Sequence, residues 1–352
     1  MLQKVLMKGN EAIAEGALTA GCQAFFGYPI TPSSEIAEYM AKKYPLLGGT
    51  FVQAESELAA INMVYGGAST GARVMTASSG PGLSLKQEGI SFIAEAELPC
   101  LIINISRGGP GLGGIQPAQS DYFQATRGGG HGDYFTMVLA PSTVQEMYDF
   151  AIEGFDLADK YRTPVILLAE GTLGQMMEPV VPRDKVTEFY DKPWATNGCK
   201  GRERNIINTL HLDPDYLEYR NSVLQAKYRE IRAKEQRAEL FQTDDADIVV
   251  VAFGLLSRIV KKSVMEARRK GLKVGMIRPV TLWPFPADIV SKVADTARTF
   301  LSVEINHGQM IDDIRLAVNG KAPVEFYGRI GVIPSPEEIT KQIVQLAERK
   351  DF

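Results

Sequence analysis

Short apolar runs alternate with amphipathic stretches along the first half of the chain. The spacing of apolar residues predicts helices over Val52–Ala68 and Thr143–Lys160 and strands over Leu98–Ile105, Thr136–Leu139 and Pro164–Leu168. Ser142 or Thr143 is expected to cap the second helix. A side chain three residues further on, Gln145 or Glu146, would complete a capping box. Strands that alternate with helices are typical of a doubly wound parallel sheet, which we expect over residues 1–185.

The same alternation returns at Asp247 and continues to the C-terminus. Strands are predicted at DIVVVAFG, KVGMIRP, TFLSVEIN and PVEFYGR, and helices over Leu255–Lys270, over Pro286–Ala297, after TFLSVEIN and at the end of the chain. Ser335, Pro336 and Glu338 supply the cap, the first-turn proline and the capping-box acid of the last helix. We therefore expect a second, smaller open-sheet domain over residues 244–352.

Residues 186–243 have a different character from the two domains that they join. The segment DKPWATNGCKGRERN shows no periodicity, whereas Leu217, Leu224, Tyr228 and Ile231 fall on one face of a helix rich in charged residues. We interpret this region as a connecting arm whose amphipathic helix packs on another surface, a partner's surface being one alternative.

Composition narrows the class of protein. Among the 352 residues, 45% are apolar and 23% charged, and the net charge is −4, so no basic or acidic tail points to nucleic acid. No apolar run approaches the length of a membrane span, and the N-terminus lacks the apolar core of a signal peptide, so we expect a cytoplasmic protein. Cys22, Cys100 and Cys199 are far apart and show no paired spacing, which argues against a disulfide framework, a zinc site or an iron–sulfur site.

Four polar or glycine-rich stretches follow predicted strands or precede predicted helices in the first domain. They are GYPITPSSE (residues 27–35), QAESE (53–57), SSGPG (78–82) and SRGGP (106–110). The prolines of the first stretch force the backbone to turn away from a strand end. Because ligands bind beyond the carboxyl ends of strands in open α/β sheets, we expect all four stretches to line one crevice.

Taken separately, each stretch also has a purely structural interpretation. Thr31 could serve only as a hydroxyl residue of a turn. Glu55 could serve only as an acid in the first turn of a helix, where the helix dipole favours a negative charge. SSGPG suits a plain turn into a helix, although its bare helix N-terminus could also receive an anion or an aromatic ring. Arg107 suits a surface residue, yet its flanking glycines leave space for a carboxylate. Glu57 lies two residues after Glu55, and one of the two is expected to point inward.

Together these stretches resemble the α-subunit of the 2-oxoacid:ferredoxin oxidoreductases. The resemblance rests on YPITPSSE, then QAESELAAINMVYGGASTGARVMTASSGPGLSL, then INISRGGPGLGGIQPAQSDYFQATRGGGHGD and VLAP, in this order and spacing. The segments IRPVTLWPFP and VEINHGQM of the second domain are also similar to the family, and the arm matches least. The implied fold is a thiamin diphosphate pyrimidine-binding domain followed by a transketolase C-terminal-like domain.

The resemblance implies an enzyme that works only with partner subunits. The family uses thiamin diphosphate to decarboxylate a 2-oxoacid, passes the electrons through [4Fe–4S] clusters to ferredoxin and gives the acyl group to coenzyme A. Its α-subunit supplies the pyrimidine-facing half of the site, and the β-subunit supplies the diphosphate and Mg²⁺ half. The chain has no GDG motif followed by paired asparagines, and Gly132–Tyr134 is the nearest approach to one. We expect the isolated chain to be inactive, with the presence of γ and ferredoxin-like δ subunits left open.

Roles follow for individual residues from the same resemblance. Glu55 matches the family glutamate that hydrogen-bonds the aminopyrimidine ring and helps its amino group to take the proton from thiazolium C2, with Glu57 as second choice. Such a carboxyl works as a donor, so it is expected in an apolar site with a raised pKa. Thr31 matches the threonine that contacts the substrate's carboxylate or oxo oxygen, and Arg107 matches the arginine that pairs with the same carboxylate.

The remaining expected site residues line the coenzyme. Those are Tyr28, Pro29, Ser79, Gly80, Pro81 and Gly82, with the glycine loop approaching the pyrimidine through bare backbone. His131 lies in a matching loop, where a structural or gating role is an alternative to a chemical one. His307 receives no role, and no residue of this chain is expected to bind a metal.

Substrate choice is expected to depend on the segment GLGGIQPAQSDYF. It is less polar than the STGxPT-like segment of relatives that act on 2-oxoglutarate, and no second cation is evident beside Thr31 or Arg107. This favours a branched-chain 2-oxoacid such as 3-methyl-2-oxobutanoate over 2-oxoglutarate or an aryl 2-oxoacid. Two other classes stay open: a transketolase-like or 2-oxoacid dehydrogenase E1 β-type chain without an iron–sulfur partner, and a degenerate regulatory or scaffold subunit.

Overall fold

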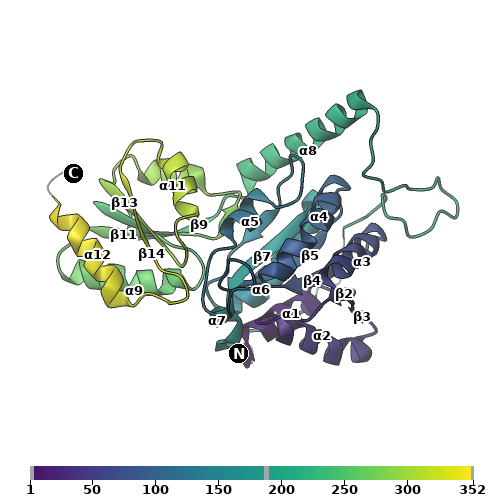
Figure 1. Ribbon diagram of the computed structural model, residues 1–352, viewed down its shortest axis with the longest axis horizontal. Coiled ribbons are helices and arrows are strands. Elements are labelled where there is room, and N and C mark those ends of the chain that lie inside the picture. Colours follow the sequence, from purple (N-terminus) through teal and green to yellow (C-terminus); the bar gives the residue numbers. More distant parts are fainter. Residues whose placement is uncertain (1–3, 186–189, 350–352) are drawn as a thin grey trace.

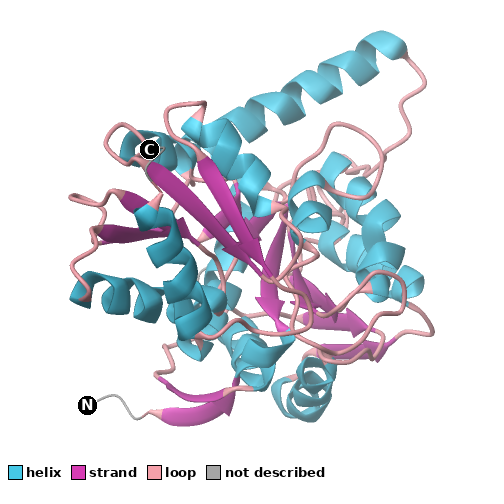
Figure 2. Ribbon diagram, turned by 60° about the vertical axis from the view of Figure 1, so that its left-hand side comes forward, coloured by secondary structure: helices cyan, strands magenta, loops and turns pink. Residues whose placement is uncertain are grey.

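The computed structural model describes residues 4–185 and 190–349, which form two open sheets with helices on both sides (Figures 1 and 2). The first sheet contains β2 (Ala24–Gly27), β3 (Thr50–Gln53), β4 (Val74–Ser78), β5 (Cys100–Ser106), β6 (Met137–Leu139), β7 (Pro164–Glu170) and β12 (Thr281–Trp283). Its order is β12-β6-β7-β5-β4-β2-β3, and every pair is parallel except β12 with β6. The expected doubly wound sheet is confirmed.

Helices cover both faces of this sheet. They are α1 (Gly9–Thr19), α2 (Ser34–Leu47), α3 (Glu57–Ser69), α4 (Pro81–Glu95), α5 (Tyr122–Arg127), α6 (Val144–Tyr161) and α7 (Gly171–Gln175). A separate antiparallel pair joins β1 (Val5–Lys8) to β8 (Met177–Val180). The predicted helix over Val52–Ala68 is wrong at its start, because its first two residues end β3 and the helix begins at Glu57.

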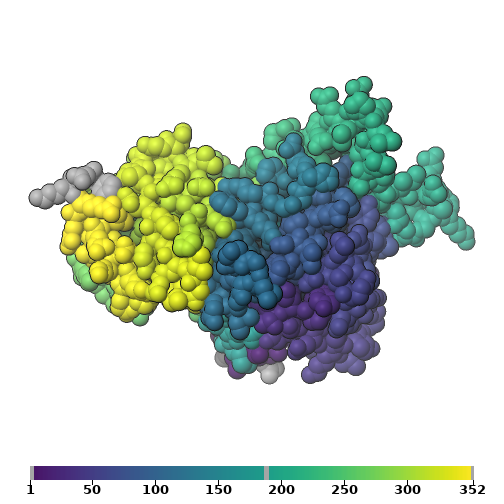
Figure 3. All heavy atoms as spheres, in the orientation of Figure 1, coloured from purple at the N-terminus to yellow at the C-terminus, as the bar shows by residue number. Residues whose placement is uncertain are grey.

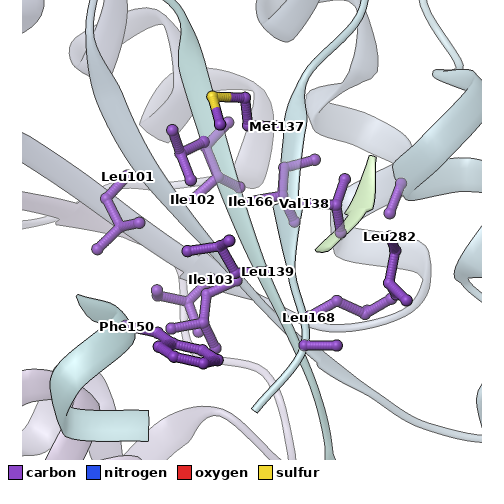
Figure 4. Packing of buried hydrophobic residues seen from close by; sticks show 14 of the residues in the cluster. Leu101, Ile102, Ile103, Met137, Val138, Leu139, Phe150, Ile166, Leu168 and Leu282 are labelled. Atoms are coloured by element: carbon purple, nitrogen blue, oxygen red, sulfur yellow. The ribbon is translucent and has the colours of Figure 1, made fainter. Parts of the chain in front are cut away.

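The central strands are apolar on both faces because helices cover both faces. All seven residues of β5 and all seven of β7 are buried. Figure 4 shows Phe150 of α6 beside Ile103 and Leu139. Of the caps considered for α6, Thr143 is the one used: its hydroxyl oxygen accepts a hydrogen bond from the backbone N–H of Glu146 (3.1 Å).

The second sheet has the order β14-β13-β10-β11-β9. Its strands are β9 (Ala238–Phe241), β10 (Ile248–Val251), β11 (Val274–Pro279), β13 (Thr299–Glu304) and β14 (Val324–Gly328), with helices α9 (Leu256–Arg269), α10 (Ala287–Val293), α11 (Met310–Val318) and α12 (Pro336–Glu348). The predicted start of α12 is confirmed, because Ser335 and Glu338 form both halves of a capping box. None of the helices that the structure describes is long and apolar enough to cross a membrane.

Two strands cross the domain boundaries expected from the sequence. β9 lies in the segment 186–243, but it pairs antiparallel with β11 of the second sheet. β12 lies in the segment 244–352, but it pairs with β6 at the edge of the first sheet. The two domains are therefore joined through their sheets as well as through the chain, which the local pattern of apolar residues could not indicate.

The amphipathic helix of the arm is α8 (Pro214–Lys234), which packs on its own chain. Leu224, Tyr228 and Ile231 are buried, whereas Leu217 is 44% exposed and does not belong to the packed face. The Tyr228 ring lies edge-on to the ring of Trp283, at a centroid distance of 5.8 Å. The covered surface is therefore this chain's own, while the loop before α8 projects from the molecule (Figure 3).

Buried polar side chains connect the two domains. Gln119 donates from Nε2 to Glu170 Oε1 (2.6 Å) at the end of β7, and its Oε1 accepts the backbone N–H of Ile305 (3.1 Å). Glu170 also accepts the backbone N–H of Leu255 (3.2 Å), and burial raises the pKa of the Glu170 carboxyl to about 6. The motif VEINHGQM contributes Asn306, whose Nδ2 donates to the Gln119 carbonyl (3.0 Å).

Candidate functional site

The four polar stretches lie at one edge of the first sheet. They follow β2, β3, β4 and β5, which are neighbours in the order β5-β4-β2-β3 and run parallel. Parallel neighbours end at the same edge, so the strand order brings these stretches together. The expected convergence is confirmed.

The backbone of the turn after β2 is bound by side chains of the first domain, and the side chains of the turn are exposed. Arg107 Nη1 donates to the Thr31 carbonyl (2.8 Å), and Asn10 Nδ2 donates to the Pro32 carbonyl (2.7 Å). Tyr28, Pro29 and Thr31 itself are exposed. The backbone of the turn is thus fixed to the domain, while its side chains remain accessible to a ligand or a partner.

Arg107 is buried and joins two loops, so it is not the surface residue of the structural alternative. Its Nη1 reaches Thr31, its Nη2 donates to the Leu112 carbonyl (3.1 Å), and only 8% of the residue is exposed. Its Nε is buried without a hydrogen-bond partner among the described residues. A Cβ atom added to Gly80 would lie 3.2 Å from that nitrogen. A buried donor without a partner is costly, and an incoming acceptor would satisfy it.

The two acids after β3 differ in their surroundings, and the burial expected for Glu55 needs correction. Glu55 is exposed, whereas Glu57 is only 7% exposed. Ser56 is the N-cap of α3 and accepts the backbone N–H of Ala59 (3.2 Å), so Glu57 is the first helical residue. The expectation that Glu55 lies in a buried apolar site is therefore wrong for this chain: Glu55 precedes the cap, and Glu57 enters the interior.

Glu57 packs against the start of α4. A Cβ atom on Gly82 would lie 2.7 Å from Glu57 Oε1 and would overlap Ser78 Oγ. The hydroxyl groups of Ser78 and Ser79 are buried and have no hydrogen-bond partner among the described residues. Gly80 has φ +46°, a conformation that favours glycine. A carboxyl and two unsatisfied hydroxyls therefore lie beside backbone that carries no side chain.

We expect Gly82→Ala to lower the free energy of unfolding by about 1–3 kcal/mol, because its methyl group would overlap atoms of Ser78 and Glu57. Gly66→Ala is the matched control, since Gly66 lies within α3 and its added Cβ meets no atom within 4 Å. That control should gain up to about 1 kcal/mol from helix propensity. Urea unfolding measures both variants, and equal stability of the two would contradict the close approach at Gly82.

Sequence reasoning missed Lys86, although it lies one helical turn after Gly82. It is fully buried, and its Nζ donates to Thr76 Oγ1 (3.2 Å). Burial lowers the pKa of Lys86 to about 8, and the negative charge of Glu57 opposes that shift. The spacing of Gly82 and Lys86 could have indicated this position, because residues four apart share one face of a helix.

A second missed pair joins a residue of β5 to the residue before α5. Asn104 Nδ2 donates to Asp121 Oδ2 (3.1 Å), and burial raises the pKa of the Asp121 carboxyl. Asp121 precedes α5 within the segment that was expected to select the substrate. The contact was not predictable because Asp121 and Asn104 are 17 residues apart in the sequence.

The two histidines that the sequence singled out lie away from this edge. His131 is exposed and borders a cavity of about 450 Å³, which Ser91 and Glu95 of the last turns of α4 also line. The edge with the glycine loop is at the opposite end of that helix. His307 is exposed beside the N-terminus of α11 in the second domain.

Comparisons with known protein families cover both domains. The family described as "Pyruvate flavodoxin/ferredoxin oxidoreductase, thiamine diP-bdg" matches residues 15–239. The family described as "Pyruvate:ferredoxin oxidoreductase core domain II" matches residues 246–339.

Individual relatives agree with these families. The chain is 53% identical to the "Ketoisovalerate oxidoreductase subunit VorB" of Methanothermobacter thermautotrophicus, over 93% of this chain and 93% of that protein. It is 37% identical to the "2-oxoglutarate synthase subunit KorA" of Methanocaldococcus jannaschii, over 96% of this chain and 98% of that protein.

Solved structures show the same fold. The 2-oxoglutarate:ferredoxin oxidoreductase from Magnetococcus marinus, with 2-oxoglutarate, coenzyme A and succinyl-CoA bound, has a TM-score of 0.89 and 28% identity. It covers 97% of this chain, which spans 65% of that one. A split-gene transketolase, 11% identical with a TM-score of 0.61 over 96% of this chain and 97% of its own, shares the fold alone.

Proposed function

This chain belongs to the 2-oxoacid:ferredoxin oxidoreductase family, and we infer from this that it is the α-type subunit of a branched-chain 2-oxoacid:ferredoxin oxidoreductase. The reaction would convert a 2-oxoacid and coenzyme A into an acyl-CoA and CO₂, with two electrons passed to ferredoxin. The observation that carries the proposal is the buried carboxyl of Glu57 beside bare Gly82 and the unsatisfied hydroxyls of Ser78 and Ser79. These groups lie at the edge where open α/β sheets bind ligands.

The residues at this edge fit the aminopyrimidine half of thiamin diphosphate. An aromatic ring that carries nitrogen atoms needs a surface without protruding side chains against its face and hydrogen-bonding groups at its edge. Gly80 and Gly82 supply backbone without side chains, and Ser78 and Ser79 supply hydroxyls that lack partners among the described residues. Tyr28, Pro29 and Pro81 would complete the lining from the neighbouring turn and the helix start. When bound, this coenzyme would supply the thiazolium ring that takes up the electron pair left by decarboxylation.

Glu57, in place of Glu55, is the acid that we assign to the coenzyme. Burial of a carboxyl favours its neutral form, which can donate a hydrogen bond to a ring nitrogen. Glu57 can then hold a proton at its carboxyl oxygen and share it with a basic ring. Glu55 is exposed and lacks the environment that this role needs.

Arg107 and Thr31 are the residues that we assign to the substrate's carboxylate. The Arg107 charge is buried, which strengthens its attraction for an anion, and its Nε is a donor without a partner among the described residues. The hydrogen bond from Arg107 to the Thr31 carbonyl keeps the turn and the guanidinium in a fixed relation. Fixed geometry of this kind lets a site discriminate a carboxylate from a neutral carbonyl group.

A partner subunit is needed to complete the site. Apolar side chains border the edge and are exposed in this chain: Tyr28 (39%), Leu58 (46%), Leu85 (56%), Leu112 (80%) and Ile115 (62%). Large exposed apolar side chains on the elements that carry a site suit a surface that a partner covers. We propose that a β-subunit covers them and brings Mg²⁺ and the diphosphate half-site.

The [4Fe–4S] clusters are also assigned to partner subunits. Cys22 and Cys100 are both buried, and burial raises the pKa of each thiol, that of Cys22 to about 12. A raised pKa disfavours the thiolate that binds iron. Besides the β-subunit, γ and ferredoxin-like δ subunits are candidates to hold clusters that pass electrons to ferredoxin.

The experiment is copurification from the native source, with thiamin and iron analysis and an assay against several 2-oxoacids with coenzyme A and a viologen acceptor. We expect kcat/KM for 3-methyl-2-oxobutanoate to exceed that for 2-oxoglutarate at least about tenfold, because an apolar pocket rejects a distal carboxylate. A preference for 2-oxoglutarate would contradict the substrate class. A complex without iron would point to the E1 β-type alternative, and one without thiamin diphosphate would refute the enzyme proposal.

A further inference from the structure

Lys86 is a charged residue in the interior of the first domain that none of the roles above uses. It is fully buried in α4, and its Nζ donates to Thr76 Oγ1 at 3.2 Å. A buried ammonium group is costly unless an opposite charge compensates for it. The compensating charge nearby is that of Glu57, the charged group that raises the pKa of Lys86.

The packing of α3 against α4 brings the two charged side chains into the same region. Gly82 lies against Glu57, and two turns later a Cβ atom on Gly89 would lie 2.6 Å from Ile61 Cγ2. Glu57 and Ile61 are four residues apart on α3, so they share a face. Lys86 lies between the two glycines on α4, four residues after Gly82 and three before Gly89, so it lies on the face of α4 that packs against α3.

The strand below contributes only neutral groups to this seam. Thr76 and Ser78 alternate along β4 on one face of the sheet, and both are fully buried hydroxyl residues. Thr76 holds the Lys86 ammonium, while Ser78 lies beside Gly82 and Glu57. Arg107, the other cation nearby, lies beyond Gly80 and is bound to two carbonyl groups.

We propose that Lys86 is a positioning residue that acts through Glu57: its ammonium group stabilises the ionised carboxylate and thereby sets the pH at which Glu57 takes up the proton that it shares with the coenzyme. The inference rests on the proposed function, since it needs Glu57 to be the acid that meets the pyrimidine ring. Burial and Lys86 act on Glu57 in opposite directions, because burial favours the neutral carboxyl and the cation favours the charged one.

The chemistry sets the sign of the effect. A cation near a buried carboxyl favours its ionised form. Without the cation, desolvation is unopposed and the carboxyl holds its proton to a higher pH. Since the pKa of Lys86 is lowered to about 8, the lysine carries its charge at neutral pH and loses it in mildly alkaline solution.

The test is Lys86→Met in the assembled complex. We expect the alkaline limb of the pH profile of kcat/KM, where the neutral carboxyl loses its proton, to move to higher pH by about one unit. A second readout needs no turnover: the infrared band of the protonated Glu57 carboxyl in the full chain, identified by its loss in Glu57→Gln, should titrate at a pH higher by the same amount. Lys292→Met is the matched control, since Lys292 is exposed on α10 of the second domain, and it should leave both curves unchanged.

Thr76→Val keeps the test decisive if Lys86→Met fails to fold. It removes the hydrogen bond to Nζ and leaves the lysine in place, so we expect a smaller shift in the same direction. Unchanged pH profiles and infrared titrations in the variants that fold, together with a Glu57→Gln complex that is inactive, would overturn the role of Lys86 and leave the proposed function intact. Full turnover by Glu57→Gln would instead refute the role of Glu57 on which the inference rests.

Discussion

Glu57→Gln is expected to lower kcat of the assembled enzyme about 10²–10⁴-fold, the usual loss when a group that transfers a proton is removed. The glutamine has the same shape and fits the space beside Gly82, but it cannot hold or release the proton. Steady-state kinetics with 3-methyl-2-oxobutanoate, coenzyme A and a viologen acceptor measure the effect. Affinity for thiamin diphosphate, measured by titration of the coenzyme-free complex, should fall as well, because a hydrogen bond to the ring is weakened.

Glu55→Gln is the matched control for this experiment. The two acids are separated by Ser56 alone, so the variants change the same chemical group at nearly the same place in the sequence. Because Glu55 is exposed, we expect its replacement to change kcat no more than about twofold. The reverse result, a large loss with Glu55→Gln and none with Glu57→Gln, would show that the exposed acid is turned into the site when the partner binds.

Glu304→Ala is expected to lower the free energy of unfolding by about 4 kcal/mol, because it leaves several buried donors without an acceptor. The Glu304 carboxylate accepts backbone N–H groups of three successive residues at the start of α11, Gln309 (3.0 Å), Met310 (2.8 Å) and Ile311 (3.0 Å). It also accepts the hydroxyl of Ser302 (2.9 Å). A carboxylate at a helix N-terminus gains further from the helix dipole.

Urea unfolding measures this loss, with Glu218→Ala as the matched control. Glu218 is exposed on α8, and its replacement should change the free energy of unfolding by less than about 0.5 kcal/mol. Since Asn306 of the same motif binds Gln119 in the first domain, the Glu304 variant should also loosen the contact between the domains. A stability equal to that of the control would mean that water accepts the hydrogen bonds of the backbone N–H groups at the start of α11 in the variant.

The relation between sequence and fold differs from one region to the next. The strands around CLIINIS and PVILLAE were predictable because a short, unbroken apolar run between turns is typical of a strand buried on both faces. The helix predicted from Val52 began too early. The apolar residues at the end of β3 continue into those of α3 without a visible break in the sequence pattern. The pairing of β9 with the second sheet and of β12 with the first sheet was not predictable. Strands that pair across long distances in the sequence leave no local pattern.

The candidate site shows the same division. Arg107 and the glycine loop were predictable from the resemblance and from their place after strands, and the structure brings them together at one edge. The burial expected for Glu55 was wrong, because both Glu55 and Glu57 have the sequence pattern of a first-turn acid. Which of them enters the interior depends on where the cap falls, and Ser56 decides that through its bond to Ala59.

The family, the two open-sheet domains and the loops expected to carry the chemistry could be predicted from the sequence, because periodicity, turn residues and motif spacing are local properties. That Glu57 is the buried acid, that Lys86 lies near it and that α8 covers its own chain became known only from the three-dimensional packing. These outcomes depend on how close two helices approach and on which side chains lose their water. Such distances arise from packing between distant segments, and no pattern within one segment contains them.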